Sequence, residues 1–353
     1  FKSVCAAVDK VSERSPMQAL LTSVLGAMGQ REASIRAVVP SLMAYAKALE
    51  WDAKWELAVD VYETLLAHLH PVEEAGACVD AHLRLGVCCR SLQQMDRALA
   101  AYACVFEIGN ATGDIEAILR SRMGEADLAM WRGNLPHAAS QFDALIDSAA
   151  KAGLRDVHAR ALMGRAGVAI MAKQYELAIR LGYESLQNQD SPVERDRVLS
   201  NIAAAFLSLG VFSAARDAYL VLSVTAREQY LRWTATINLL ELSSVTGSEV
   251  LFEQYRRQLS SEKLPPQLET AYHLTLGTGL QQLDHVENAR VHLERAIRLA
   301  HGYGLNQYRL EAESALAALN VPAPPRRAPS LMPTGVEGVA RAIQQLRELS
   351  GVG

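Results

Sequence analysis

The chain has 353 residues, of which 50% are hydrophobic and 21% are charged, enough apolar material for a continuous core. Its formal net charge of −4 gives no sign of a nucleic-acid partner or of an anionic membrane surface. No apolar run approaches the ~20 residues that a membrane-spanning helix needs. We therefore expect a cytoplasmic protein that makes no membrane contact and, in this part of it, no direct contact with nucleic acid.

The start of the chain carries two apolar stretches with helical character. They run from Val4 to Val11 and from Met17 to Met28, and Ser15-Pro16 separates them, where the proline suits a first helical turn. We expect residues 1–34 to be an N-terminal helical cap or the remnant of a preceding domain. There is no secretory signal. Because the first residue is Phe1 and not Met, we expect a piece of a longer chain or one with a trimmed start.

Residues 35–320 repeat with a period of 37 to 40 residues. A small or apolar residue recurs at one helical position, at intervals of 40, 40, 40, 37, 37 and 37 residues. Further large or apolar residues follow most of these markers at four and seven positions, which places a buried stripe on one face of a helix. The seven markers are Ala58, Ala98, Ala138, Ala178, Ala215, Phe252 and Ala289.

A second helix precedes the marked one in each unit. Twelve residues before the marker stands Gly86 in one unit and Gly277 in another, and four other units have alanine there. Such small residues allow two helices to approach closely. A period of this length without the alternation of strands predicts a stack of helix pairs. We call the first helix of each pair helix A and the marked helix B.

Beyond the repeats the chain becomes proline-rich and then helical again. Residues 321–333 cannot continue a helix and indicate a semi-rigid linker. In the last segment, residues 334–353, Thr334 and Glu337 have the spacing of a capping box. An apolar stripe follows, made of Val336, Val339, Ile343, Leu346 and Leu349.

The apolar stripe of this C-terminal helix must be buried somewhere. Three arrangements are open. The helix covers the end of the repeats as a cap; it folds back into their groove or docks on a second copy of the chain; or it leads to an output domain. Intramolecular docking and a homodimer are therefore both candidates.

No pattern in the chain indicates catalysis. It has no glycine-rich phosphate loop, no His-Glu-x-x-His and no nucleophile elbow. Cys78 and His82 could share a metal ion on one helix face, but no second pair completes a zinc site. Buried thiols are the simpler interpretation of the cysteines. We expect no enzyme activity, no cofactor and no metal.

The repeat pattern resembles the tetratricopeptide repeat (TPR). Leu85-Gly86 with Ala98, Tyr102 and Val105 is one of the best matches. A second is made of Leu276-Gly277 with Ala289, Leu293 and Ala296. The family repeat has about 34 residues, so the longer period here implies longer helices or turns. The resemblance implies an all-α, right-handed α-solenoid of about seven helix-turn-helix repeats with helical caps.

In such a solenoid the A helices line the concave groove. With Gly86 as the eighth position of its helix, the inward residues fall at positions 2, 5, 6, 9 and 13. Position 2 carries arginine in three successive units, position 5 methionine in two, position 6 asparagine in two, and position 13 a tryptophan. These candidate binding residues are Arg120, Arg160, Arg197, Met123, Met163, Asn201, Asn238 and Trp131.

The resemblance implies that Arg160 and Arg197, at position 2, hold a carboxylate and that Asn201 and Asn238, at position 6, grip an extended main chain. It therefore predicts a non-catalytic scaffold that binds a protein or peptide segment, with an acidic segment as one candidate. Alternatively, the arginines pair with nearby carboxylates such as Glu125, Asp127 and Glu194.

A second function is open for the same fold. The chain could be the ligand- or peptide-sensing part of a bacterial transcriptional or signalling regulator whose output domain lies outside this sequence. The Asn201 and Asn238 pair and the lone C-terminal helix favour it. Abundant alanine and an excess of arginine over lysine indicate a bacterial source.

Overall fold

The computed structural model describes residues 16–28, 35–51, 54–319 and 328–352. Within these residues all regular structure is helical, in 17 helices with no strand. None of these helices is both long enough and apolar enough to cross a membrane. The all-α fold class predicted from the repeat pattern is therefore confirmed.

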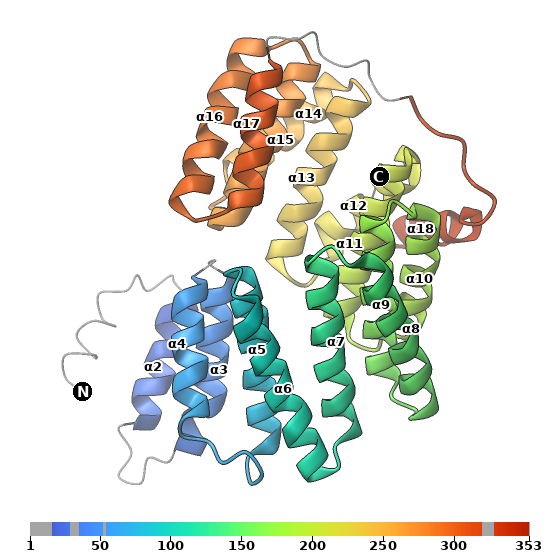
Figure 1. Cartoon of the computed structure of the whole chain (residues 1–353). Coiled ribbons are helices and arrows are strands. Elements are labelled where there is room, and N and C mark those ends of the chain that lie inside the picture. Colours follow the sequence, from blue (N-terminus) through green and yellow to red (C-terminus); the bar gives the residue numbers. More distant parts are fainter. Residues whose placement is uncertain (1–15, 29–34, 52–53, 320–327, 353) are drawn as a thin grey trace. The chain divides into compact units, whose positions relative to one another are not determined.

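Seven A/B helix pairs follow one another along the chain (Figure 1). A single helix, α2 (Pro16–Met28), precedes them, and α17 (Asn306–Ala318) and α18 (Glu337–Leu349) follow them. The pairs are α3 (Ile35–Trp51) with α4 (Trp55–Leu66), α5 (Ala75–Ser91) with α6 (Met95–Thr112), α7 (Ile115–Trp131) with α8 (Leu135–Lys151), α9 (Arg155–Met171) with α10 (Tyr175–Asn188), α11 (Pro192–Leu209) with α12 (Phe212–Thr225), α13 (Gln229–Val245) with α14 (Glu249–Ser260), and α15 (Pro266–Gln282) with α16 (Val286–Gly302).

Every marker residue lies on a B helix with its side chain buried. The least buried of them, Phe252, is 3% exposed. The residues four positions later are also buried in most units, and Tyr62, Tyr102 and Phe142 are among the largest side chains with almost no exposed surface. In α14 the equivalent Arg256 is half-exposed, and the preceding Tyr255 is buried in its place. The seven predicted repeats are therefore the structural units of the fold.

The small residues of the A helices allow close packing against the B helices. A Cβ atom at Gly86 would overlap the ring of Tyr102, and one at Gly277 would come within 2.6 Å of Leu293 Cγ. The Tyr102 ring also contacts the next A helix, where a Cβ at Gly124 would lie 2.6 Å from it. Tyr102 of α6 is therefore held between glycines of α5 and α7.

The turns between A and B helices share one backbone feature. The residue five positions before the marker has a positive φ in six repeats, the left-handed conformation that residues other than glycine rarely adopt. Three of the six are not glycine. The residues are Gln93 (61°), Gly133 (79°), Lys173 (59°), Gly210 (84°), Gly247 (76°) and Asp284 (64°).

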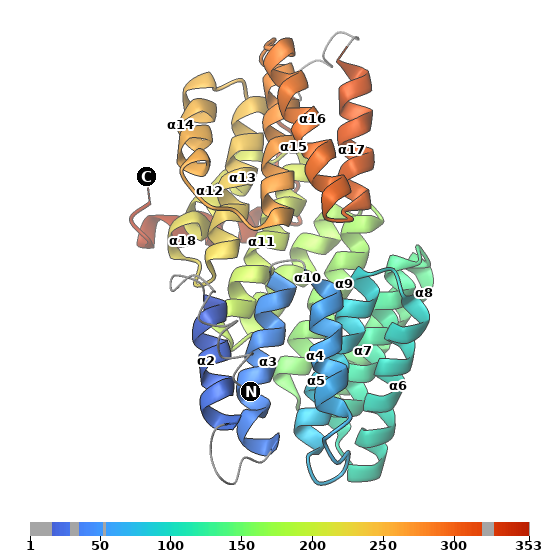
Figure 2. The same cartoon turned by 90° about the vertical axis from the view of Figure 1, so that its left-hand side faces the viewer.

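The chain divides into two compact units, residues 1–157 and 158–353. In the first unit, A helices contact each other in the series α3, α5 and α7, and B helices pack beside them. In the second, α11, α13, α15 and α17 form the same kind of series, which Figure 2 shows for α13 and α15. The A helices of each unit therefore make a layer of their own. The sequence did not indicate this division, which falls within α9.

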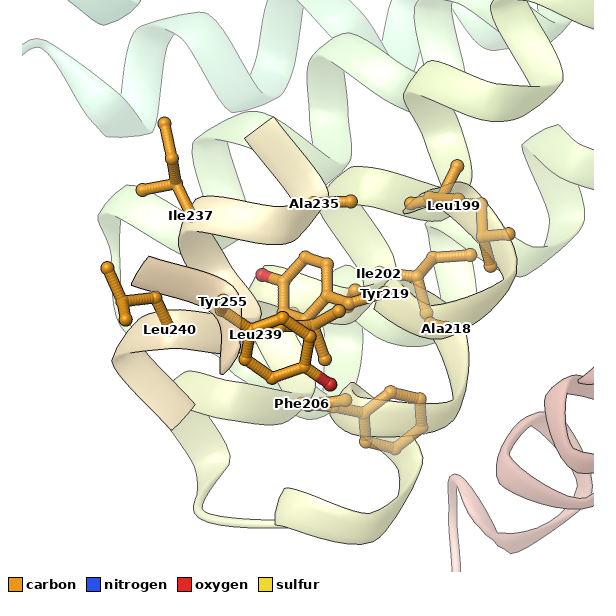
Figure 3. Close-up of a cluster of buried hydrophobic side chains, with 14 of the residues drawn as sticks. Leu199, Ile202, Phe206, Ala218, Tyr219, Ala235, Ile237, Leu239, Leu240 and Tyr255 are labelled. Carbon is orange, nitrogen blue, oxygen red and sulfur yellow. The ribbon is translucent and has the colours of Figure 1, made fainter. Parts of the chain in front are cut away.

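The core of the second unit centres on α11, α12 and α13. Its largest fully buried side chains include Phe206, Tyr219 and Ile202, and Figure 3 shows these residues together with Leu239 and Tyr255. Leucines and alanines of α15 and α16 extend the same cluster. This core fixes the spacing of the A helices that carry the candidate site.

The C-terminal helix α18 packs against the B helices α12 and α10. Val336, Val339 and Ile343 of its stripe are buried there, whereas Leu349 is 86% exposed. Before it, the Ser330 amide donates to the Gly210 carbonyl (3.0 Å). Residues 321–327 of the expected linker lie outside the described residues.

Two details of the termini differ from or extend the expectations. The capping box at Thr334 is wrong: α18 begins at Glu337, and its N-cap, Val336, makes no side-chain cap. A turn over residues 334–336 precedes the helix, so Thr334 is not its N-cap residue. At the other end, α2 matches the stretch from Met17 to Met28 and packs on α3. The stretch from Val4 to Val11 lies outside the described residues.

Candidate ligand-binding groove

The A-helix layer of the second unit is hollowed between α13, α15 and α17. The hollow is a pocket of about 450 Å³. Its walls are mixed, with aliphatic, hydroxyl, amide, phenol and carboxyl groups. The lining residues are Tyr230, Thr234, Ile237, Asn238, Glu241, Leu268, Ala271, Leu274, Thr275, Thr278, Tyr308 and Glu311.

These lining residues follow the repeat register. In α13, positions 2, 5, 6 and 9 are Thr234, Ile237, Asn238 and Glu241, and all four line the pocket. In α15 the same positions are Ala271, Leu274, Thr275 and Thr278, and all four line it as well. In α17, Tyr308 and Glu311 continue positions 2 and 5. The pocket is therefore built by the inward face of three successive A helices.

A second, smaller pocket of about 250 Å³ lies between α11, α12 and α13. It includes Ala204 and Ser208 of α11, Tyr219 of α12, and again Asn238 and Glu241 of α13. Asn238 and Glu241 thus belong to both hollows. Among the described residues neither side chain has a hydrogen-bond partner, so the amide and the carboxylate are available to a ligand.

The electrostatics of this region are set by burial. Burial raises the pKa of the Glu241 carboxyl above its ordinary range, because the charged form loses water without gaining a compensating cation. Burial also raises the pKa of the Tyr219 hydroxyl, and Glu241 adds to this effect. The pKa of Tyr230 is raised to about 12 by burial, with Tyr308 as the second cause.

Of the predicted binding residues, five lie in the second unit. Asn201 of α11 and Asn238 of α13 hold equivalent positions on A helices that contact each other, and both are half-buried. Met163 is half-buried and packs on the core, and Arg160 is exposed. Only Asn238 lines either of the two pockets.

Arg197, also in the second unit, is engaged within the protein. Its Nη2 lies 3.1 Å from Glu228 Oε2, and its Nη1 lies 3.1 Å from Glu194 Oε1. The two carboxylates are 18% and 19% exposed at the side chain. Pairing of the position-2 arginines with carboxylates of the protein is the alternative that the sequence left open. A ligand carboxylate would have to compete with two internal ones.

The other three predicted residues lie in the first unit. Arg120 Nη2 is 2.9 Å from Asp80 Oδ1, which joins position 2 of two successive repeats. Trp131 is 56% exposed, and the Arg90 guanidinium lies 5.6 Å from its ring centre, within cation–π range. Met123 is half-buried. The eight candidates therefore form two sets, one in each unit.

Sequence reasoning missed two carboxylates and a phenol that line the pocket. Glu241 stands at position 9, a column named as inward but not followed from repeat to repeat. Tyr308 and Glu311 stand on α17, which continues the register beyond the seventh marker. Reading position 9 and extending the 37-residue period by one helix would have found all three.

The structure also places four of the cysteines and His82. Among the described residues, no three His, Cys, Asp or Glu side chains come together as a metal ion would require. Cys78, Cys88, Cys89 and Cys104 are free thiols, and the first three are buried. Burial raises the pKa of the Cys78 thiol, and Glu74 adds to the shift, so this thiol is a weak nucleophile.

Comparison with solved structures identifies the fold. The apo form of the quorum sensor NprR from B. thuringiensis has a TM-score of 0.51 and 13% sequence identity, covering 84% of this chain and 91% of its own. PilF from Pseudomonas aeruginosa has a TM-score of 0.45 and 18% identity over 68% of this chain and 97% of its own. No protein-family model and no curated protein matches the sequence. At the level of fold, the chain is a TPR-like helical-repeat protein.

Proposed function

We propose that this chain is a non-catalytic binding module that holds a peptide or protein segment along the A helices of its second unit. The observation that carries the proposal is the 450 Å³ pocket built by equivalent positions of α13, α15 and α17. Its lining offers the unpaired amide of Asn238 beside apolar surface from Ile237 and Leu274. An amide can both donate to and accept from an extended main chain, and apolar walls accept side chains.

The three arginines at position 2 contribute less to the proposed ligand binding than the sequence implied. Arg120 and Arg197 are already paired with Asp80, Glu194 and Glu228. Ion pairs of this partly exposed kind contribute up to about 1 kcal/mol, so they restrain the guanidinium groups without burying them. Arg120, Met123 and Trp131 lie on α7 of the first unit and are not part of the proposed site.

A second candidate function is ligand sensing within a bacterial regulator. It is favoured by the fold likeness to a protein described as a quorum sensor and by the docking of α18 on α12 and α10. A helix tethered by a linker and held on the B helices can report a change in the repeats beneath it. The free thiols of the four described cysteines agree with a reducing, cytoplasmic setting.

A display selection from random peptides tests the proposal. The full chain would be used as bait beside Thr275→Trp, which fills the pocket, and Val291→Trp on α16, where Val291 is 59% exposed. We expect peptides that bind the unaltered chain and Val291→Trp but not Thr275→Trp, with equal melting temperatures for all three. Peptides retained equally by Thr275→Trp would mean that binding occurs elsewhere.

A further inference from the structure

The two pockets that share Asn238 and Glu241 carry negative charge only. Among the described residues that line them, Glu241 and Glu311 are charged, and none is lysine, arginine or histidine. Glu241 has no hydrogen-bond or ion-pair partner in the described part of the chain. A half-buried carboxylate of this kind is unfavourable for folding. A cationic group of a ligand would compensate this carboxylate.

A buried hydroxyl next to Glu241 also lacks a partner. Tyr219 has no exposed surface, lines the smaller pocket, and its Oη has no hydrogen-bond partner within the described residues. Figure 3 shows its ring in the buried cluster with Ile202, Phe206 and Leu239, so packing fixes its position. Buried polar atoms are almost always paired. An unpaired hydroxyl near an unpaired carboxylate offers a polar ligand group two hydrogen-bonding partners.

Aromatic groups also line the larger pocket. Tyr230 of α13 and Tyr308 of α17 both line it, and they are close enough for Tyr308 to influence the pKa of Tyr230. The faces of tyrosine rings attract cations, by about 0.5–2 kcal/mol depending on exposure. They also accept the aliphatic stems of lysine and arginine side chains. Carboxylates and tyrosine rings in one hollow suit an organic cation.

We propose that this pocket takes the cationic side chain of a lysine or arginine in a bound peptide, with Glu241 as its counter-charge. The inference rests on the proposed peptide-binding function and adds the charge of the ligand. Asn238 would hold the peptide backbone next to that residue, and Tyr230 and Tyr308 would enclose the stem. An acidic side chain is disfavoured at this point, because the carboxylates of Glu241 and Glu311 repel it.

A set of peptides with one varied residue tests this assignment. Each peptide is drawn from the selected pool, acetylated and amidated at its ends, and its central position is lysine, arginine, alanine or glutamate. A further peptide has alanine at the centre and a free amino terminus, which separates a side-chain cation from a terminal ammonium. Affinities are measured for the full chain, for Glu241→Gln, and for Glu262→Gln, a matched change at an exposed glutamate.

We expect lysine and arginine peptides to bind the full chain and Glu262→Gln at least about tenfold more tightly than alanine peptides. Glu241→Gln should reduce this preference to about twofold or less while still binding the alanine peptide. Equal affinity for lysine and alanine, a preference for glutamate, or dependence on the free amino terminus alone would overturn the assignment and leave peptide binding intact. Absence of binding by every peptide would instead overturn the proposed function.

Discussion

Arg347 of α18 donates from Nη1 to Asp217 Oδ1 on α12 at 2.9 Å, across 130 residues of sequence. The side chains are 25% and 11% exposed, so the pair is shielded from water. It lies beside the apolar contacts of Val339 and Ile343. The C-terminal helix is therefore held to the B helices by both charge and burial, and none of its residues lines the two pockets that share Asn238.

Replacing Arg347 with methionine should loosen α18. The change leaves Asp217 nearly buried and unpaired, which costs about 1–3 kcal/mol. Hydrogen exchange of the α18 amides should then be at least about tenfold faster, with little change in α13 or α15. Arg341→Met, an exposed change on the same helix, is the control. Equal exchange in both variants would show that the ion pair does not hold the helix.

Substitution by glycine should stabilise the protein at two turn residues that have a positive φ. Lys173 (φ 59°) and Gln93 (φ 61°) adopt a backbone conformation that glycine takes in three other repeats. Lys173→Gly or Gln93→Gly should each raise the free energy of unfolding by about 0.5–1 kcal/mol, because relief of the steric strain exceeds the entropy lost. Chemical denaturation measures this. The neighbouring Ala172→Gly should lower the free energy of unfolding. An equal decrease in Lys173→Gly would show that the backbone at Lys173 is not strained.

The close approach at Tyr102 should be intolerant of one added methyl group. In Gly124→Ala the new Cβ would lie 2.6 Å from the tyrosine ring, and the overpacking should cost about 1–3 kcal/mol. Tyr102→Leu in the same chain should recover part of that cost. Gly76→Ala, where nothing lies within 4 Å, should be neutral or stabilising by up to about 1 kcal/mol. A harmless Gly124→Ala would disprove the contact.

The raised pKa of Glu241 gives a pH-dependent prediction. Burial favours the protonated carboxyl in the folded state, so its contribution to stability is present below the ordinary pKa of glutamate. That contribution is lost as pH rises through the folded-state pKa. Glu241→Gln stays neutral and should melt higher than the unaltered chain at pH 8, with the difference vanishing near pH 4. Glu262→Gln should show no such trend, and a lower melting temperature for Glu241→Gln at pH 8 would contradict the burial argument.

The periodic part of the fold could be predicted from sequence because each repeat uses the same contact. Ala98 and its equivalents, together with small residues such as Gly86, specify where an A and a B helix touch, and that information is local. The division near residue 157 and the docking of α18 depend on contacts between distant segments. Arg347 and Asp217 carry no pattern that relates them in sequence, so no periodicity could have paired them.

The candidate site could be predicted in part, because its residues also follow the repeat register. Counting from Gly86 placed Asn238 on the inward face, and Asn238 does line the pocket. The count could not reveal that Arg197 is paired with Glu228, which belongs to the next repeat and lies outside the counted columns. Nor could it distinguish Glu241 from the solvated glutamates of the chain, because burial of its carboxyl depends on three helices at once.

The most direct test of the account is the affinity of a selected peptide for the chain in which Asn201→Ala and Asn238→Ala are combined. We predict a loss of at least about tenfold, or roughly 1.4 kcal/mol, with no appreciable fall in melting temperature, because neither amide has a partner in the described structure. Unchanged affinity in a folded double variant would contradict the assignment of peptide binding to the A-helix groove.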